Sequence, residues 1–361
     1  GIMNSYDSIP KKTKEAMDVF SDYFTSVDFS DEKRIKVLLD EYFTSYKSSL
    51  NSQGSYYMQR RAKKTASHQG AFNEITHGIS QFYSVLKFLK MDIHDIQKRL
   101  LKIHKTILSS GCVIFSIADS DSSKVFEENL SDFINKAELT PLLKKKEIDE
   151  DSFKSLTLLE GESYSDSSRE IFTLNTQVGY LSSGYPVSPM CTKENAAEVI
   201  LAKYLSGSLL WEKIRTKGGA YGASASTQGI NDGFFCTTYR DPNPEKSLKI
   251  FSECFKIASK EKLSCEDLSR FVTGNYGEAH QPHSPYSDGW IGIWRFLSSI
   301  TDEDRKLQNC LELDVSSEDI QKAAERLYKY SLQPERNSSA VIIDKSKKKK
   351  KNTGIIVDLP L

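Results

Sequence analysis

An arginine and a tyrosine stand close together in the string Ile-Arg-Thr-Lys-Gly-Gly-Ala-Tyr-Gly-Ala, which runs from Ile214 to Ala223. Arg215 offers a planar fork of N–H donors that can hold a carboxylate or a carbonyl group. The hydroxyl of Tyr221 can donate a further hydrogen bond. Apolar residues before the string recur at helical spacing, which predicts a helix that ends near Arg215. Gly218 is expected to supply the positive φ that ends this helix at little cost.

A strand is expected from Tyr221 to Gln228, with Tyr221, Ala223, Ala225 and Thr227 on one face. The small side chains in this strand leave room for a second backbone to lie beside it, within reach of the preceding arginine. The string also suits a purely structural interpretation. Arginine is favoured at a helix C-terminus, Gly-Gly is an ordinary cap, and tyrosine is common in strands.

The complete string, with the apolar helix before it and the strand Gly233-Phe234-Phe235 after it, resembles the C-terminal half of the pitrilysin/insulinase superfamily of zinc peptidases. The presequence protease and falcilysin branch is the most similar, and the resemblance is strongest over about residues 168–330. It implies that Tyr221 donates to the oxyanion or scissile carbonyl and that Arg215 clamps the substrate. The substrate-binding residues that it implies between and beside them are Gly218, Gly219, Ala220 and Gly222.

The family's zinc site is an inverted H-x-x-E-H motif on a helix, which lies in the N-terminal half of those enzymes. None of the six histidines of this chain begins such a motif or its H-E-x-x-H mirror. We therefore expect no metal site in this chain and no peptidase activity from it alone. The resemblance implies that Zn²⁺ belongs to the full-length enzyme, with its ligands in an N-terminal catalytic half that is either fused or separate. The other implied partners are unstructured peptide substrates.

Three further groups of residues invite a functional interpretation, and for each we favour a structural one. His280 and His283 with Glu278 fall short of a full ligand set for zinc and are expected in a surface loop. Glu74 and His77 have the spacing of one half of a di-iron site, but no second copy is evident. The run Lys347–Lys351 is expected to be a solvated loop between two strands.

The 361 residues carry 49 basic and 49 acidic side chains, so no global field favours binding to nucleic acid or to an anionic membrane. No apolar run reaches the length of a membrane-spanning helix. The six scattered cysteines include no C-x-x-C pair and are expected to be reduced and mostly buried. Composition thus favours a soluble intracellular protein, in the cytoplasm or in an organelle matrix.

The fold class expected is α+β, with two tandem domains of the pitrilysin/insulinase type in which helices cover an antiparallel sheet. Residues 1–142 are expected to form a helix-rich domain whose one clear strand is Cys112–Ile117. Because one strand cannot form a sheet, this domain is expected to be incomplete at its N-terminus. Residues 143–166 are expected to be a linker, and residues 167–361 an α+β domain that carries the Arg215–Tyr221 clamp.

Two details are expected near the end of the chain. Residues 340–343 and 354–357 are predicted to form a hairpin, and helical spacing predicts core positions for an apolar group that consists of Trp290, Trp294, Phe296 and Leu297.

Three functions remain open at this point. The first is the C-terminal half of a zinc endopeptidase that degrades unstructured, targeting-peptide-like substrates inside a closed chamber. The second is a non-catalytic homologue of the core-subunit type found in respiratory complexes. The third is an unrelated α+β binding domain. The presence of both Arg215 and Tyr221 favours the first, because a purely structural subunit needs no substrate clamp.

Overall fold

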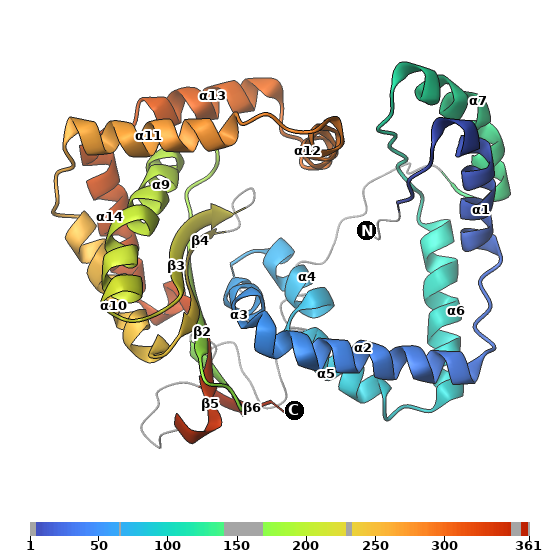
Figure 1. The fold of residues 1–361 in the computed structure, drawn as a ribbon, viewed down its shortest axis with the longest axis horizontal. Coiled ribbons are helices and arrows are strands. Elements are labelled where there is room, and N and C mark those ends of the chain that lie inside the picture. Colours follow the sequence, from blue (N-terminus) through green and yellow to red (C-terminus); the bar gives the residue numbers. More distant parts are fainter. Residues whose placement is uncertain (1–4, 65, 141–168, 229–232, 348–354, 360–361) are drawn as a thin grey trace. The chain divides into compact units, whose positions relative to one another are not determined.

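A computed structural model describes residues 5–64, 66–140, 169–228, 233–347 and 355–359 (Figure 1). These residues form two compact units. The first draws on residues 5–42, 85–140 and 283–297, and the second on residues 43–84, 169–282 and 298–359. The linker expected at 143–166 lies outside the described residues, so the division predicted there stays a prediction. The structure adds that residues 43–84 belong to the same compact unit as the C-terminal sheet.

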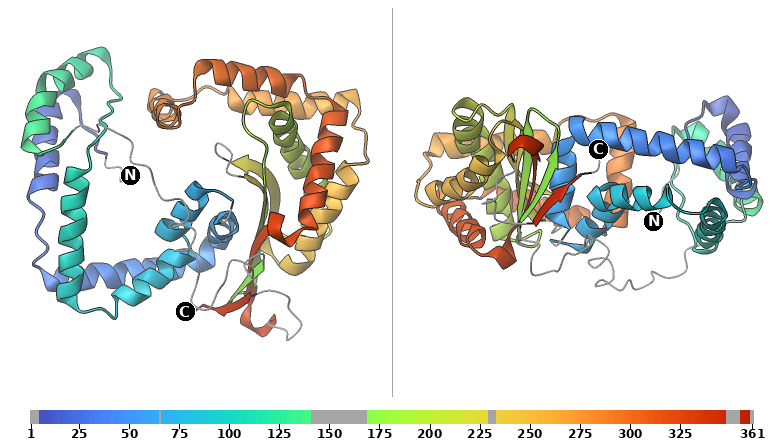
Figure 2. Two further views of the ribbon diagram at one scale, coloured as in Figure 1. Left: turned by 180° about the vertical axis from the view of Figure 1, so that it is seen from behind. Right: turned by 90° about the horizontal axis from the view of Figure 1, so that it is seen from below.

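The first unit is helical. Its elements are η1 (Pro10–Lys12), α1 (Thr13–Thr25), the first part of α2 (Glu32–Ser52), the end of α5 (Ile79–Phe88), α6 (Ile93–Ser109), α7 (Ser120–Lys136) and α12 (Pro285–Leu297). Helices α1 and α7 lie side by side (Figure 2), and Met17 packs there against Phe133 and Ala137. The ring of Phe20 stacks on Phe133 with centroids 6.1 Å apart. This small cluster forms one hydrophobic core of the unit.

The strand expected at Cys112–Ile117 is not formed. Cys112 alone in this run has a bridge assignment, and its N–H donates to the carbonyl of Thr140 at 2.9 Å. Val113, Phe115 and Ile117 remain 45, 38 and 38 % exposed, because no described strand of this unit lies beside them. The β-branched run therefore lacks the partner that would make it a strand.

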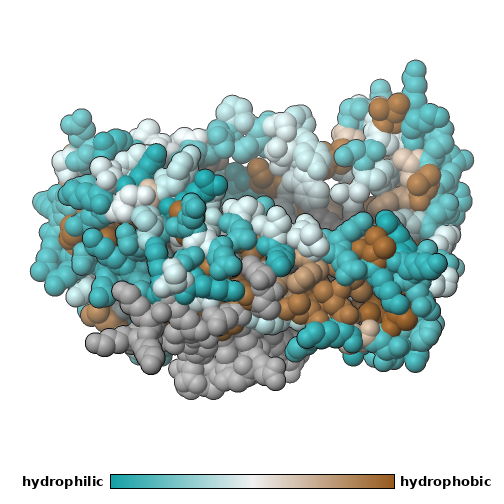
Figure 3. All heavy atoms as spheres, turned by 60° about the horizontal axis from the view of Figure 1, so that its bottom comes forward, coloured by the Kyte–Doolittle hydropathy of each residue, from teal (hydrophilic) through white to brown (hydrophobic). Residues whose placement is uncertain are grey.

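Several apolar side chains of the first unit remain exposed. Trp294 and Phe296 in α12 are 58 and 67 % exposed, so the core positions predicted for them are wrong, as is that of Leu297 at 40 %. Helical spacing shows that residues share a face but not that anything covers the face. Figure 3 shows hydrophobic residues gathered into a patch on one face, with hydrophilic residues along its upper and right-hand borders.

The second unit is built around one six-stranded sheet. The strands lie in the order β3-β4-β2-β5-β1-β6. β1 pairs in parallel with β5 and β6, and the remaining pairs are antiparallel, so the sheet is mixed rather than antiparallel as expected. The predicted C-terminal hairpin is wrong for the same reason, because β1 lies between β5 and β6. The bounds are β1 (Arg169–Leu174), β2 (Gly179–Tyr185), β3 (Gly222–Gln228), β4 (Gly233–Asp241), β5 (Ser338–Asp344) and β6 (Ile355–Asp358).

Helices cover one face of this sheet, as the α+β class requires (Figure 1). α9 (Lys193–Tyr204), α10 (Pro244–Ala258) and α14 (Ser317–Ser331) form the main core with it, and α11 (Cys265–Ala279) and α13 (Asp302–Leu313) pack against α9. Capping boxes at Thr301–Asp304 and Ser316–Asp319 begin α13 and α14. The short elements are η3 (Leu205–Leu209), η4 (Trp211–Thr216), η5 (Pro334–Arg336) and η6 (Lys345–Lys347).

The opposite face of the sheet is contacted by α3 (Gly54–Lys63), which α4 (His68–His77) follows. Gly54 allows this approach, because a Cβ atom there would lie 2.2 Å from the ring of Tyr180 in β2. The hydroxyl of Tyr180 donates to the carbonyl of Asn51 at 2.9 Å, at the end of α2. Strand β2 is therefore buried on both of its faces.

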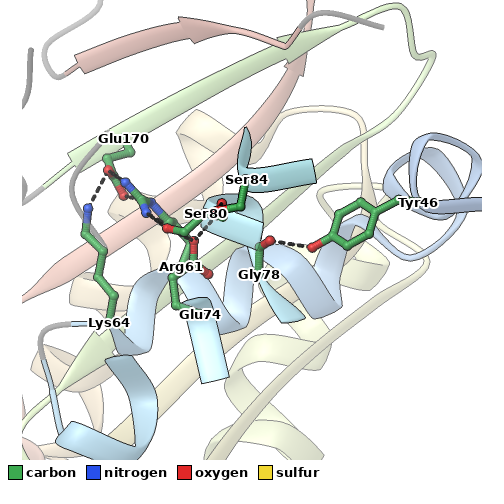
Figure 4. Close-up of polar contacts among 8 residues, drawn as sticks. All are labelled: Tyr46, Arg61, Lys64, Glu74, Gly78, Ser80, Ser84 and Glu170. Atoms are coloured by element: carbon green, nitrogen blue, oxygen red, sulfur yellow. Dashed lines mark hydrogen bonds and ion pairs between the residues drawn. The ribbon is translucent and has the colours of Figure 1, made fainter. Parts of the chain in front are cut away.

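Four charged side chains are buried together where α3 and α4 meet β1 (Figure 4). Arg61 donates from Nε and Nη2 to Glu170 at 2.8 and 2.6 Å, and Lys64 Nζ lies 2.6 Å from the same carboxylate. Arg61 Nη1 also donates to Glu74 Oε1 at 3.0 Å. Each side chain is at most 1 % exposed, and two cations balance two carboxylates. This cluster joins the helices to the sheet.

The carboxylates of Glu74 and Glu170 differ in how fully they are hydrogen-bonded. Glu74 Oε1 also accepts from the Ser80 N–H at 3.0 Å, whereas its Oε2 is buried without a partner among the described residues. Burial raises the pKa of the Glu74 carboxyl, and the charge of Arg61 lowers it by less. A raised pKa in the folded state favours the protonated form. The contribution of Glu74 to stability is therefore greatest below the ordinary glutamate pKa and is lost as the pH rises through the raised value.

We predict that Glu170→Gln and Glu74→Gln have unequal effects on stability at neutral pH. The first leaves Arg61 and Lys64 buried without their shared carboxylate and should cost about 3–5 kcal/mol. The second should cost about 1 kcal/mol or less, because it relieves the burial of a poorly satisfied charge. It should also remove the part of the stability that increases as the pH falls from neutral. Urea unfolding at several pH values measures both effects, and equal losses for the two variants would contradict this account.

Candidate functional site

The helix that carries Arg215 changes its winding before it ends. α9 is followed by two π-helical segments, η3 and η4. In such segments an N–H bonds to the carbonyl five residues back, as Lys217 does to Glu212 at 2.9 Å. The helix itself is confirmed, but apolar spacing did not reveal its wider winding. π-helical turns are rare and are found disproportionately at functional sites.

The double glycine turns the chain, but the two glycines have different roles from those expected. The positive φ is at Gly219, at 79°, and not at Gly218. Gly218 is needed for space instead, because a Cβ atom there would lie 2.5 Å from the carbonyl oxygen of Ile214. The same carbonyl accepts from the Ala220 N–H at 3.1 Å, and Gly219 donates to the Arg215 carbonyl at 3.1 Å. These bonds close the end of η4.

Arg215 and Tyr221 lie close to each other across this turn. The guanidinium of Arg215 lies 3.8 Å from the centroid of the Trp211 ring and 5.9 Å from that of Tyr221. Tyr221 is 67 % exposed, and its hydroxyl makes no hydrogen bond to any described residue. Both side chains thus keep their donors available, and the role predicted for them stays a prediction. Trp211, which the sequence did not single out, holds Arg215 in place through a cation–π contact.

Strand β3 is at the edge of the sheet, yet its free edge is not fully open. Ser206 in η3 accepts from the Ala225 N–H at 2.8 Å, and its hydroxyl lies 3.0 Å from the Ala225 carbonyl oxygen. The expectation that a second backbone could lie beside this strand is therefore wrong at Ala225. A hydroxyl from the neighbouring helix protects the edge there.

A second segment, Tyr239–Pro242, lies beside the turn and was missed from the sequence. The ring of Tyr239 meets that of Tyr221 edge-on at 5.8 Å, and a Cβ atom on Gly219 would lie 3.7 Å from Pro242. The register of β4 on β2 shifts here, which marks a β-bulge, and Arg240 within it has a φ of 48°. The available signal was the string Thr-Tyr-Arg-Asp-Pro-Asn, at residues 238–243, where β4 ends.

The residues that could be imagined as zinc ligands have other partners. His280 stacks on Tyr276 at 3.9 Å, and its two ring nitrogens lie 2.9 Å from the Tyr276 carbonyl and 3.2 Å from the Asn309 amide. Glu278 pairs with Lys203, and Glu74 is held by Arg61. Among the residues that the structure describes, no three His, Cys, Asp or Glu side chains come together as a metal site.

Two further findings concern composition. The six cysteines are all free, but only Cys236 and Cys254 are fully buried, fewer than expected. None of the described helices combines the length and the apolar character needed to cross a membrane.

Two family models match the chain. One, described as "PreP C-terminal domain", matches residues 169–345, and the other, for a peptidase-associated domain, matches residues 1–89. The chain is similar to the mitochondrial presequence protease of Drosophila melanogaster, with 25% identity over 91% of this chain and 30% of that protein. The corresponding protein of Saccharomyces cerevisiae is 26% identical over 92% of this chain and 33% of its own length. The chain thus spans about a third of the length of these relatives.

A solved structure has a similar fold. A protease from Helicobacter pylori aligns with a TM-score of 0.55 and 15% identity, over 92% of this chain and 76% of that one. Together with the two matched family models, these relatives place the string around Arg215 and Tyr221 in the family that its residues indicated. The chain belongs to the pitrilysin/insulinase superfamily of peptidases, in its presequence protease branch, and its residues 169–345 match that branch's C-terminal domain.

Proposed function

We propose that this chain is the substrate-clamping half of a zinc-dependent endopeptidase that degrades unstructured peptides inside a closed chamber. The observation that carries the proposal is the pair formed by Arg215 and Tyr221. Tyr221 is exposed and Arg215 is partly exposed beside it, and their donors have no competing acceptor among the described residues. The names of the relatives, which are presequence proteases, support the class of substrate.

The chemistry of the pair follows from its donors. Hydrolysis of a peptide bond passes through a tetrahedral intermediate whose oxyanion is stabilised by a well-placed hydrogen-bond donor. The hydroxyl of Tyr221 can be such a donor, because its ring contacts that of Tyr239 edge-on while the side chain remains exposed. Arg215 binds a nearby carbonyl or carboxylate of the peptide through paired N–H groups. The turn at Gly218 and Gly219, with Ala220 and Gly222, brings the backbone close to the peptide without side chains in the way.

Among the described residues, no three histidine, cysteine or carboxylate side chains lie close enough together to bind zinc. The metal of the proposed enzyme is therefore expected in an N-terminal catalytic half, and this chain supplies substrate contacts only.

We predict that Tyr221→Phe, in the enzyme assembled with its catalytic half, lowers kcat about 10²–10³-fold, the usual cost of losing one oxyanion donor. KM should change little, because the ring and its contact with Tyr239 are retained. Steady-state kinetics on an unstructured peptide, with the melting temperature as a check of folding, measures this. Tyr286→Phe is the matched control, because Tyr286 is also exposed, at 55 %. Comparable kcat values for the two variants would exclude the proposed role.

We predict that Arg215→Ala damages both kcat and KM, because the guanidinium binds the peptide before and during the reaction. The loss of a charged hydrogen-bonding group should lower kcat/KM about 10- to 100-fold. Arg215→Lys should recover only part of the loss, since an ammonium cannot form the paired contact. Wild-type kcat/KM in Arg215→Ala and in Tyr221→Phe would instead favour the alternative, a non-catalytic structural homologue.

A further inference from the structure

The clamp continues beyond Tyr221 into a row of aromatic rings. The ring of Tyr239 lies between those of Tyr221, at 5.8 Å, and Tyr180, at 5.7 Å. A guanidinium lies over each of the rings of Tyr221 and Tyr239. Arg215 is 5.9 Å from the centroid of Tyr221, and Arg240 is 5.5 Å from that of Tyr239. Two cations and two rings therefore share one surface of the second unit.

The backbone at Arg240 is strained. Its φ of 48° lies in the left-handed region, which is unfavourable for a residue with a Cβ atom. The residue also occupies a β-bulge, a feature that often redirects a side chain next to a functional site. The surrounding structure uses this conformation, because the Arg240 carbonyl accepts from the Tyr221 N–H at 3.3 Å. The strained residue is thus connected directly to the clamp.

The charge of Arg240 is not neutralised within the described part of the chain. Neither Arg240 nor Arg215 has a carboxylate within ion-pair distance there. Arg240 does interact with the hydroxyl of Tyr180, but that group is neutral. Arg169 shows the contrast, since it pairs with Glu245. A guanidinium held against a ring is weakly hydrated and already oriented, so it binds an oxyanion at a reduced entropic cost.

We propose that Tyr239 and Arg240 extend the clamp and that Arg240 is a specificity-determining residue, which pairs with a carboxylate of the bound peptide. The carboxylate comes either from an acidic side chain or from the free C-terminus. Tyr239 supports the peptide through its ring and orients the guanidinium. The inference rests on the proposed function, because it requires that peptides bind at Arg215 and Tyr221, and it adds the chemical class that this surface selects.

The test is peptide binding to the full chain, measured by fluorescence anisotropy at low ionic strength. Three labelled unstructured peptides are compared: one with a single Glu and a free C-terminus, the same peptide with Glu→Gln, and the same peptide with a C-terminal amide. Wild-type protein should bind the first about tenfold more tightly than the peptide that lacks the recognised carboxylate. Whichever of the two altered peptides loses affinity identifies the source of the carboxylate.

Arg240→Gln should bind all three peptides with one affinity, equal to that of the wild-type protein for the peptide that lacks the recognised carboxylate. Arg240→Lys should keep part of the wild-type preference for the peptide that carries it. Arg336→Gln is the matched control, because Arg336 is also exposed, lies 5.1 Å from the Tyr330 ring and has no carboxylate partner among the described residues. It should discriminate like wild type. Circular dichroism confirms folding of each variant.

The outcomes separate this inference from the proposed function. Wild-type affinity that is the same for all three peptides, or discrimination that survives in Arg240→Gln, overturns the role of Arg240 and leaves the Arg215–Tyr221 clamp standing. Failure of the wild-type chain to bind any of the peptides overturns both.

Discussion

The hydrogen bond from the Tyr221 N–H to the Arg240 carbonyl joins the two segments on which the candidate site depends. Each segment must leave regular geometry to form it. The first turns at Gly219, whose φ is 79°, and the second bulges at Arg240, whose φ is 48°. Left-handed backbone is costly for arginine, so its presence needs a compensating gain. The gain that we identify is the placement of Arg240 and Tyr239 beside Arg215 and Tyr221.

Rigid elements hold these segments in place. Arg215 is fixed at the end of a long helix by its stacking on Trp211, and the strand that follows Tyr221 is fixed at its free edge by Ser206. On the other face of the sheet, the buried cluster of Arg61 and Glu170 joins the helices after residue 54 to β1. This cluster connects the regions that the two family models match. A site built on such elements keeps its donors oriented before any peptide arrives, which is the condition for effective electrostatic stabilisation.

The sequence predicted the helix before Arg215, the strand after Tyr221 and the family, because these follow from apolar spacing and from a specific string. It did not predict which glycine takes the positive φ. Gly218 is required because a side chain there would collide with the Ile214 carbonyl, and this contact is visible only in the three-dimensional structure. The bulge at Arg240 was also not predicted from the sequence, since it depends on the register between β2 and β4. The sequence failed to predict two further features for the same reason. These are the parallel pairing of β5 and β6 with β1 and the exposure of Trp294. Spacing identifies a strand or a helical face, but the partner that it meets is decided by the tertiary fold.

The central claim is that residues 215–222 and 239–242 form one peptide-binding surface. Hydrogen–deuterium exchange on the full chain, with and without a saturating unstructured peptide, tests it most directly. We expect protection from exchange to increase in both segments together, because they share the bound peptide, while helices α10 and α14 exchange as before. Protection confined to other parts of the chain, or in only one of the two segments, would contradict the account.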